Sequence, residues 1–231
     1  MNYQVINETI VKVIGPSVDG KKSVNTGSII SESGNILTCA HGLSQDSFAT
    51  VELHGAQYPA SIRYLNRRLD IAILSLNVTV PALKHALPVD AVLEPEIGSD
   101  CVIVGFPHDV AEATLCKIHL GAKTRQHDFN WLRLMGSLVD GFSGGPMIIN
   151  DKVFGIVLTK HDVLNEHFHQ IPDFYPLGML KKSIQAQENV GFGYGITLKE
   201  AAGHDENLLI LAGKDFSANA SFKNMVRSMQ K

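Results

Sequence analysis

Short runs of β-forming residues follow one another along most of this chain, in two sets of six. The first set occupies residues 9–15, 25–31, 35–38, 49–53, 58–64 and 71–76. The second set occupies residues 101–105, 113–120, 131–138, 146–150, 152–159 and 190–197. Evenly spaced short strands with turn residues between them favour a sandwich or barrel over alternating βαβ units. The sequence therefore predicts an all-β protein.

The composition agrees with a folded, strand-rich chain. Of the 231 residues, 45% are hydrophobic and 19% are charged, which excludes a disordered chain. The formal net charge of −3 argues against sequence-independent binding to nucleic acid or to an anionic membrane. No apolar run approaches the ~18 residues of a membrane span.

Two segments do not fit the strand rhythm. Residues 161–188 form a polar insertion between the last two runs, and loops of that length are often functional. Near the C-terminus, Phe222, Met225, Val226 and Met229 make one apolar stripe at helical spacing. We expect a short amphipathic helix there, which either packs on its own barrel or docks on a partner.

One stretch, Gly-Phe-Ser-Gly-Gly-Pro at residues 141–146, is a candidate nucleophile turn. Glycines on both sides allow a tight turn that presents the Ser143 hydroxyl. The same turn can point backbone N–H groups into one concavity that would hold an oxyanion. The alternative is a glycine-rich turn without a catalytic role.

A serine nucleophile needs a base, and the base needs an orienting carboxylate. His41 ends an apolar run and begins a glycine-containing loop, and Asp70 directly precedes the apolar run at residues 71–74. Either residue alone could be structural. Together with Ser143 they follow the order His, Asp, Ser, one of the known orders of the catalytic triad. A cleft between two barrels would bring the three together.

These residues lie within a longer series of ordered motifs. The motifs occupy residues 26–30, 34–41, 69–74, 102–107, 141–146, 153–157 and 191–196. On them the chain resembles the trypsin/chymotrypsin-fold serine proteases over about residues 8–200. It is most similar to stand-alone trypsin-like peptidases and to the protease domain of the HtrA/Deg type.

The resemblance implies two packed six-stranded antiparallel β-barrels of the chymotrypsin type. Residues 1–80 would form the N-terminal barrel, 81–98 a linker, 99–200 the C-terminal barrel and 201–231 an extension with the helix. His41 and Asp70 would belong to the first barrel and Ser143 to the second. About 30 residues follow position 200, so we expect no PDZ domain in this sequence.

The resemblance also implies the chemistry. Ser143 would attack the peptide carbonyl, His41 would transfer the proton, and Asp70 would orient His41. The backbone N–H groups of Gly141 and Ser143 would form the oxyanion hole, with no metal or organic cofactor. Ser137, Leu158 and Lys160 would contribute to the substrate pocket. Since Ser137 stands where cleavage after Lys or Arg would need an acid, we expect an uncharged P1 side chain.

The sequence departs from the secreted members of this family. Phe142 replaces the acid that would pair with a newly cut N-terminus, so activation by such a cut is not expected. Gly42 excludes the disulfide beside the catalytic histidine. Cys39, Cys101 and Cys116 lack a pairing pattern, and no signal peptide is visible, so we expect reduced thiols and a cytoplasmic location.

The preferred function is an active serine endopeptidase acting on proteins or peptides. A separate hypothesis is a protease that is latent until a signal or regulatory partner rearranges its loops. A bacterial stress or defence system would fit such an enzyme. The alternative is a catalytically silent binding module with the same fold. His161, His167 and His169 in the insertion could bind a metal, but a solvated loop is the favoured interpretation.

Overall fold

The computed structural model describes residues 3–15, 23–43, 48–76, 85–107, 110–126, 128–160, 191–205 and 207–208. The insertion at 161–188, with its three histidines, and the expected helix at 217–231 lie outside the described residues. So the structure does not test either prediction. None of the helices in the described ranges is long and apolar enough to cross a membrane.

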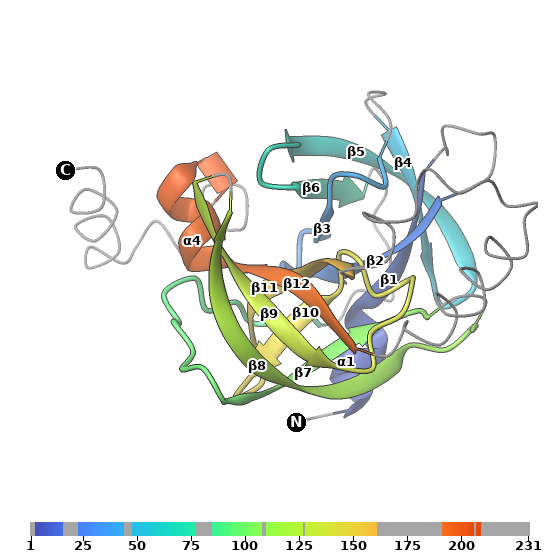
Figure 1. Ribbon diagram of the computed structural model, residues 1–231. Helices are drawn as coiled ribbons and strands as arrows, with labels where there is room; N and C mark the ends of the chain where they lie inside the picture. Colours follow the sequence, from blue (N-terminus) through green and yellow to red (C-terminus); the bar gives the residue numbers. More distant parts are fainter. Residues whose placement is uncertain are drawn as a thin grey trace, which may run out of the picture.

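The first six strands close into one antiparallel barrel (Figure 1). Their order around it is β1-β2-β3-β6-β5-β4. The bounds are β1 Ile10–Gly15, β2 Ser23–Ile29, β3 Asn35–Cys39, β4 Phe48–Leu53, β5 Ala56–Asn66 and β6 Ile71–Leu76. Each of the six runs predicted in this half of the sequence is a strand.

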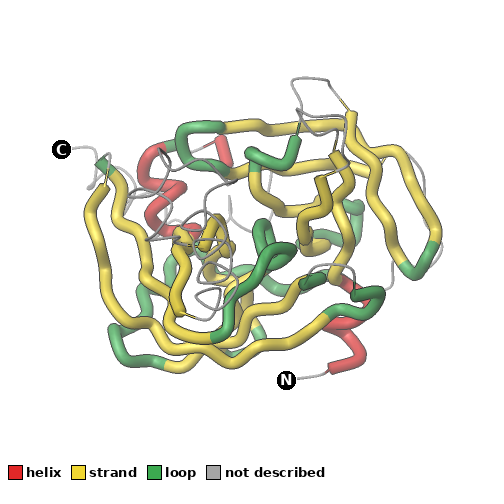
Figure 2. The backbone as a smooth tube through the Cα atoms, turned by 45° about the vertical axis from the view of Figure 1, so that its right-hand side comes forward, coloured by secondary structure: helices red, strands yellow, loops and turns green. Residues whose placement is uncertain are grey.

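The next six strands close into a second antiparallel barrel with the same connectivity, β7-β8-β9-β12-β11-β10 around the ring. The bounds are β7 Asp100–Gly105, β8 Thr114–Gln126, β9 Phe129–Gly136, β10 Pro146–Ile149, β11 Lys152–Lys160 and β12 Gly191–Thr197. Figures 1 and 2 show the two barrels side by side. The predicted double β-barrel is confirmed.

Two short helices, α1 (Tyr3–Thr9) and α4 (Leu198–His204), were not predicted. In α1, the Thr9 hydroxyl bonds back to the carbonyls of Val5 and Ile6, although the sequence assigns Thr9 to a strand. In α4, the Thr197 side chain accepts a hydrogen bond from the Glu200 N–H at 3.0 Å. This pair is the Thr-x-x-Glu signature of a capped helix start.

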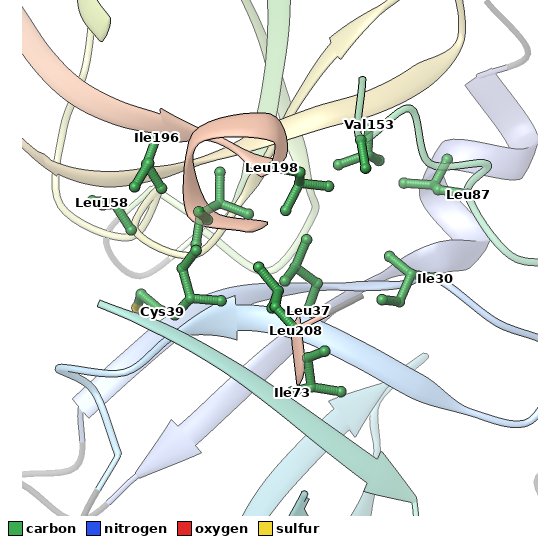
Figure 3. Packing of buried hydrophobic residues seen from close by; sticks show 14 of the residues in the cluster. Ile30, Leu37, Cys39, Ile73, Leu87, Val153, Leu158, Ile196, Leu198 and Leu208 are labelled. Carbon is green, nitrogen blue, oxygen red and sulfur yellow. The ribbon is translucent and has the colours of Figure 1, made fainter. Parts of the chain in front are cut away.

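Several strands, among them β3, β6 and β11, contribute side chains both to a barrel core and to the core where the barrels meet. Along β6, Ile71 and Ile73 face the core between the barrels, whereas Ala72 and Leu74 face the core of the first barrel. Both β3 and β11 divide their side chains in the same way. Figure 3 shows Cys39 and Ile73 from the first barrel opposite Leu158 and Ile196 from the second. The ends of these strands carry the candidate site.

The described part of the connection between the barrels is tied to both of them. The Leu87 N–H bonds to the Ile29 carbonyl in the first barrel at 2.9 Å. The Asp90 N–H bonds to the Val153 carbonyl in the second barrel at 2.8 Å. These bonds, together with the shared apolar core, hold the two barrels in a defined orientation.

Candidate functional site

His41 and Asp70 meet beyond the ends of two paired strands, β3 and β6. One carboxylate oxygen of Asp70 lies 2.7 Å from Nδ1 of the His41 ring. The other accepts the backbone N–H groups of His41 at 2.7 Å and of Ala40 at 3.0 Å. A carboxylate held by three donors fixes both the position of the ring and the tautomer with a proton on Nδ1.

Asp70 takes a backbone conformation that non-glycine residues rarely adopt, with φ of 53°. The turn before it is closed by the Asn66 side chain, whose oxygen accepts the N–H groups of Arg68 and Leu69. Left-handed residues of this kind persist when their surroundings hold them there. The three hydrogen bonds to its carboxylate, together with this turn, hold Asp70 in place.

Arg67 braces the loop that carries His41. Its guanidinium donates to the carbonyls of Ala40 at 3.3 Å and of Leu43 at 2.9 Å. The planar fork of arginine suits two acceptors in fixed geometry. The sequence analysis missed this brace, because nothing in the local pattern relates Arg67 to a loop some 25 residues earlier.

The other ring nitrogen of His41, Nε2, lies 3.7 Å from the Cys39 sulfur. Loss of water around the ring would by itself lower the pKa of His41. The hydrogen bonds to Asp70 and to Cys39 outweigh that effect and raise the pKa from 6.5 to about 10. Both contacts therefore favour the protonated form of the ring.

Ser143 stands in a turn held from both barrels. Its carbonyl accepts the Thr26 N–H of β2 at 2.8 Å, and the next N–H, that of Gly144, donates to the Val157 carbonyl of β11 at 2.7 Å. Phe142, on the other side of Ser143, is buried in the core of the second barrel. Ser143 itself is half-buried, so its hydroxyl remains accessible.

Gly144 shows how closely this turn packs against the strand that leads to His41. Its φ is 80°, and a Cβ there would lie 2.5 Å from the Thr38 hydroxyl and 2.8 Å from the Cys39 nitrogen. Only glycine fits such a place. The turn that carries Ser143 is thus in direct contact, across the two barrels, with the strand that leads to His41.

Two backbone donors of this turn have no acceptor in the part of the chain that the structure describes. Among the described residues, the N–H groups of Gly141 and Ser143 donate to no acceptor, whereas the N–H groups of Gly144 and Gly145 are both bonded. Gly141 has φ of 102°, a conformation open to glycine. Two unengaged N–H groups beside a serine hydroxyl are the elements of an oxyanion hole.

The three expected pocket residues belong to the second half of the chain, in β11 and directly after β9. Ser137 is exposed, and its carbonyl is 3.5 Å from the Cys116 sulfur. Leu158 is buried in β11 and packs in the core between the barrels (Figure 3). Lys160 ends β11. Their roles in substrate binding stay predictions.

No group of three or more possible metal ligands occurs among the described residues.

The chain resembles known proteins in both sequence and fold. The trypsin-like peptidase domain family matches residues 25–156, more than half of the chain. The serine protease DegP homolog of Plasmodium falciparum is 28% identical over 179 residues, covering 74% of this chain and 20% of that protein. Serine protease HTR4 of Rattus norvegicus is 29% identical over 151 residues, covering 60% of this chain and 30% of that protein. The chain spans less than a third of either relative.

Among solved structures, the active form of the Rv3671c protease of M. tuberculosis superposes with a TM-score of 0.65 and 20% identity. That match covers 87% of this chain and 80% of the other. The serine endoprotease of Yersinia pestis gives a TM-score of 0.63 and 20% identity, covering 89% and 64%. These likenesses establish the double-barrel fold.

Proposed function

This chain belongs to the trypsin-like peptidase family, and from that premise we propose that it hydrolyses peptide bonds as a serine endopeptidase with Ser143, His41 and Asp70 as its triad. One observation carries the proposal. The Asp70 carboxylate bonds Nδ1 of His41 at 2.7 Å, and the strand before His41 packs directly on the turn of Ser143. A histidine oriented by a carboxylate, on a segment that packs against the serine turn, supports a base and nucleophile pair.

The reaction follows from these roles. The Ser143 oxygen bonds to the peptide carbonyl carbon while its proton passes to Nε2 of His41. The carbonyl oxygen becomes an oxyanion, which the N–H groups of Gly141 and Ser143 would stabilise. The C–N bond then breaks, and His41 gives the proton to the leaving amine. Water, deprotonated by His41, attacks the resulting ester, and His41 returns that proton to Ser143 as the acid product leaves.

The contact between His41 and Cys39 supports a second candidate, a protease that rests in a latent state. Nε2 must be unprotonated and near Ser143 to act as the base. The Cys39 sulfur holds Nε2 instead and helps to raise the pKa of the ring. Binding of a substrate or regulatory protein would then release His41 toward Ser143. A role in bacterial stress or defence stays a prediction.

The cysteines support a reducing location. Cys39, Cys101 and Cys116, which are all the cysteines of the chain, are unpaired. Free thiols of this kind are usual in reducing compartments, so we keep the proposal of a cytoplasmic protein.

Cleavage of a peptide library tests the function. Wild type and Ser143→Ala are incubated with proteome-derived peptides, and the new termini are mapped. Cuts made by wild type and absent with Ser143→Ala support the proposal, and they report the P1 preference. Equal cutting by both proteins would show that Ser143 is not the nucleophile.

A further inference from the structure

Thr26 of β2 is a fully buried residue of the first barrel, and its polar groups reach the nucleophile turn of the second. Its N–H donates to the Ser143 carbonyl at 2.8 Å. Its hydroxyl bonds to the Gly141 carbonyl at 2.6 Å. Thr26 thus binds the carbonyls of the residues before and after Phe142. Of these, Gly141 lies 115 positions after Thr26 in the sequence.

The direction of the Thr26 hydroxyl is fixed by its other partner. The Phe106 N–H lies 3.1 Å from the same oxygen, and an N–H can only donate. The hydroxyl therefore accepts from Phe106 and gives its single proton to the Gly141 carbonyl. The Thr26 carbonyl, in turn, accepts the Thr38 hydroxyl at 2.7 Å, so the whole residue is locked in place.

This lock determines what the nucleophile turn can do. Thr26 engages the carbonyls of Gly141 and Ser143, so it holds the peptide that follows each of these residues. This limits the backbone dihedrals at Gly141 and Ser143, which set the direction of their own N–H groups. The N–H groups of the same two residues are those that donate to no acceptor in the described part of the chain. In one and the same backbone conformation, the carbonyls of Gly141 and Ser143 point toward Thr26 and their N–H groups stay unbonded among the described residues. Gly141 has φ of 102° in this conformation.

We infer that Thr26 is a positioning residue for catalysis: its hydroxyl, supplied by the first barrel, holds the peptide after Gly141 and thereby the backbone conformation of Gly141 that directs its N–H into the oxyanion hole of the second barrel. This inference rests on the proposed function. It also means that the hole depends on docking of the two barrels, since neither barrel contains both the hydroxyl and the turn.

Three variants separate this role from simple packing. Thr26→Val keeps the branched shape and removes the hydroxyl, while Thr26→Ser keeps the hydroxyl and removes the methyl group. Ser28→Ala is the matched control, because it removes a buried hydroxyl of the same strand that has no hydrogen-bond partner among the described residues. Active sites are counted by titration with a fluorophosphonate, so that kcat refers only to reactive, folded protein.

We expect Thr26→Val to lower kcat by about 10- to 100-fold with KM within about threefold, since one oxyanion donor is worth about 10²–10³ in kcat. Binding of a peptide boronate, whose tetrahedral adduct places an oxygen in the hole, should weaken in parallel. Binding of the matching peptide carboxylate should not change. Thr26→Ser and Ser28→Ala should keep kcat within about threefold of wild type.

The inference is overturned if Thr26→Val keeps the wild-type kcat per titrated site, or if Thr26→Ser loses as much activity as Thr26→Val. If Thr26→Val does not fold, Thr26→Ala is measured in its place. Failure of both to fold would assign the hydroxyl a structural role only. A wild type that neither reacts with the fluorophosphonate nor cuts peptides would instead refute the proposed function.

Discussion

Nε2 of His41 lies 3.7 Å from the Cys39 sulfur, and it is the atom that has to take the proton of Ser143. Cys39 is the last residue of β3, and His41 lies two positions later in the turn that follows the strand. The proposed base therefore has a second partner inside the resting site. This contact has a consequence for the pH dependence of activity.

Replacing Cys39 with alanine should move the acid limb of the pH profile to lower pH. The bond to Cys39 helps to raise the pKa of His41 from 6.5 to about 10. Since only the neutral ring can act as base, wild-type activity should rise with pH through that raised pKa. Without the sulfur the pKa falls, so activity near pH 7 should increase. The measurement is kcat/KM between pH 5 and 10.

Cys101→Ala is the control for that experiment. Cys101 is a buried thiol of the second barrel, in a core cluster that does not include His41. Its removal should leave the acid limb where it is. The same profile for wild type and Cys39→Ala would contradict the assigned role of the sulfur.

Asp70→Asn should lower kcat by about 10⁴-fold, because an amide cannot stabilise the imidazolium and selects the wrong tautomer of His41. KM should change little, since Asp70 binds His41 rather than substrate. Steady-state kinetics on the best mapped peptide give both values. A loss below tenfold would mean that Asp70 does not orient the base.

Gly144→Ala should destabilise the fold far more than Gly55→Ala. Both glycines have positive φ, 80° and 77°, so both variants carry the conformational penalty of about 1–2 kcal/mol. A Cβ at Gly144 would also lie 2.3 Å from the Thr26 carbonyl oxygen, whereas one at Gly55 meets nothing within 4 Å. In urea denaturation, the free energy of unfolding of Gly144→Ala should be lower than that of Gly55→Ala by at least ~2 kcal/mol. Equal losses would contradict the described packing.

Tyr64→Phe should loosen the attachment of α4. The Tyr64 hydroxyl donates to the Asp205 carboxylate at 2.8 Å, which joins β5 to the residue after α4. Loss of this half-exposed bond should lower the free energy of unfolding by about 0.5–1.5 kcal/mol at pH 7. Chemical denaturation of wild type and variant measures the difference.

The same pair gives a pH test of that attachment. Burial would raise the pKa of Asp205, but the hydrogen bonds from Tyr64 and its neighbours outweigh it and lower the pKa below 3.8. A carboxyl with a lowered folded-state pKa stabilises above its unfolded pKa and loses this effect as pH falls through the folded one. The difference in the free energy of unfolding between wild type and Tyr64→Phe should therefore become smaller below about pH 4. If this difference in unfolding free energy does not depend on pH, Tyr64 stabilises the fold through packing and not through its hydrogen bond to Asp205.

The sequence predicted the parts of the molecule that local patterns encode. All twelve strands followed from alternating runs and turn residues. His41, Asp70 and Ser143 followed from their positions at the ends of such runs. The structure brings these three positions together, but their catalytic roles stay a proposal.

What the sequence did not reveal depends on long-range contact or on a weak local signal. The local sequence around Thr26 indicates only a strand residue. Its functional contact is the hydrogen bond to Gly141, 115 positions later in the chain. Arg67 reaches the His41 loop in the same way. The start of α4 was available from Thr197 and Glu200, a capping pair, but β-forming residues directly before it masked the signal.

The most direct test of the central claim is the intact mass of the protein after reaction with a fluorophosphonate at pH 9. Ser143 should form one bond to phosphorus with loss of fluoride, so wild type should gain the mass of a single phosphonyl group. Peptide mapping should place that group on Ser143, and Ser143→Ala and His41→Ala should remain unlabelled. Labelling of Ser143→Ala at the wild-type rate, or none in folded wild type with or without a cleavable peptide library, would contradict the account.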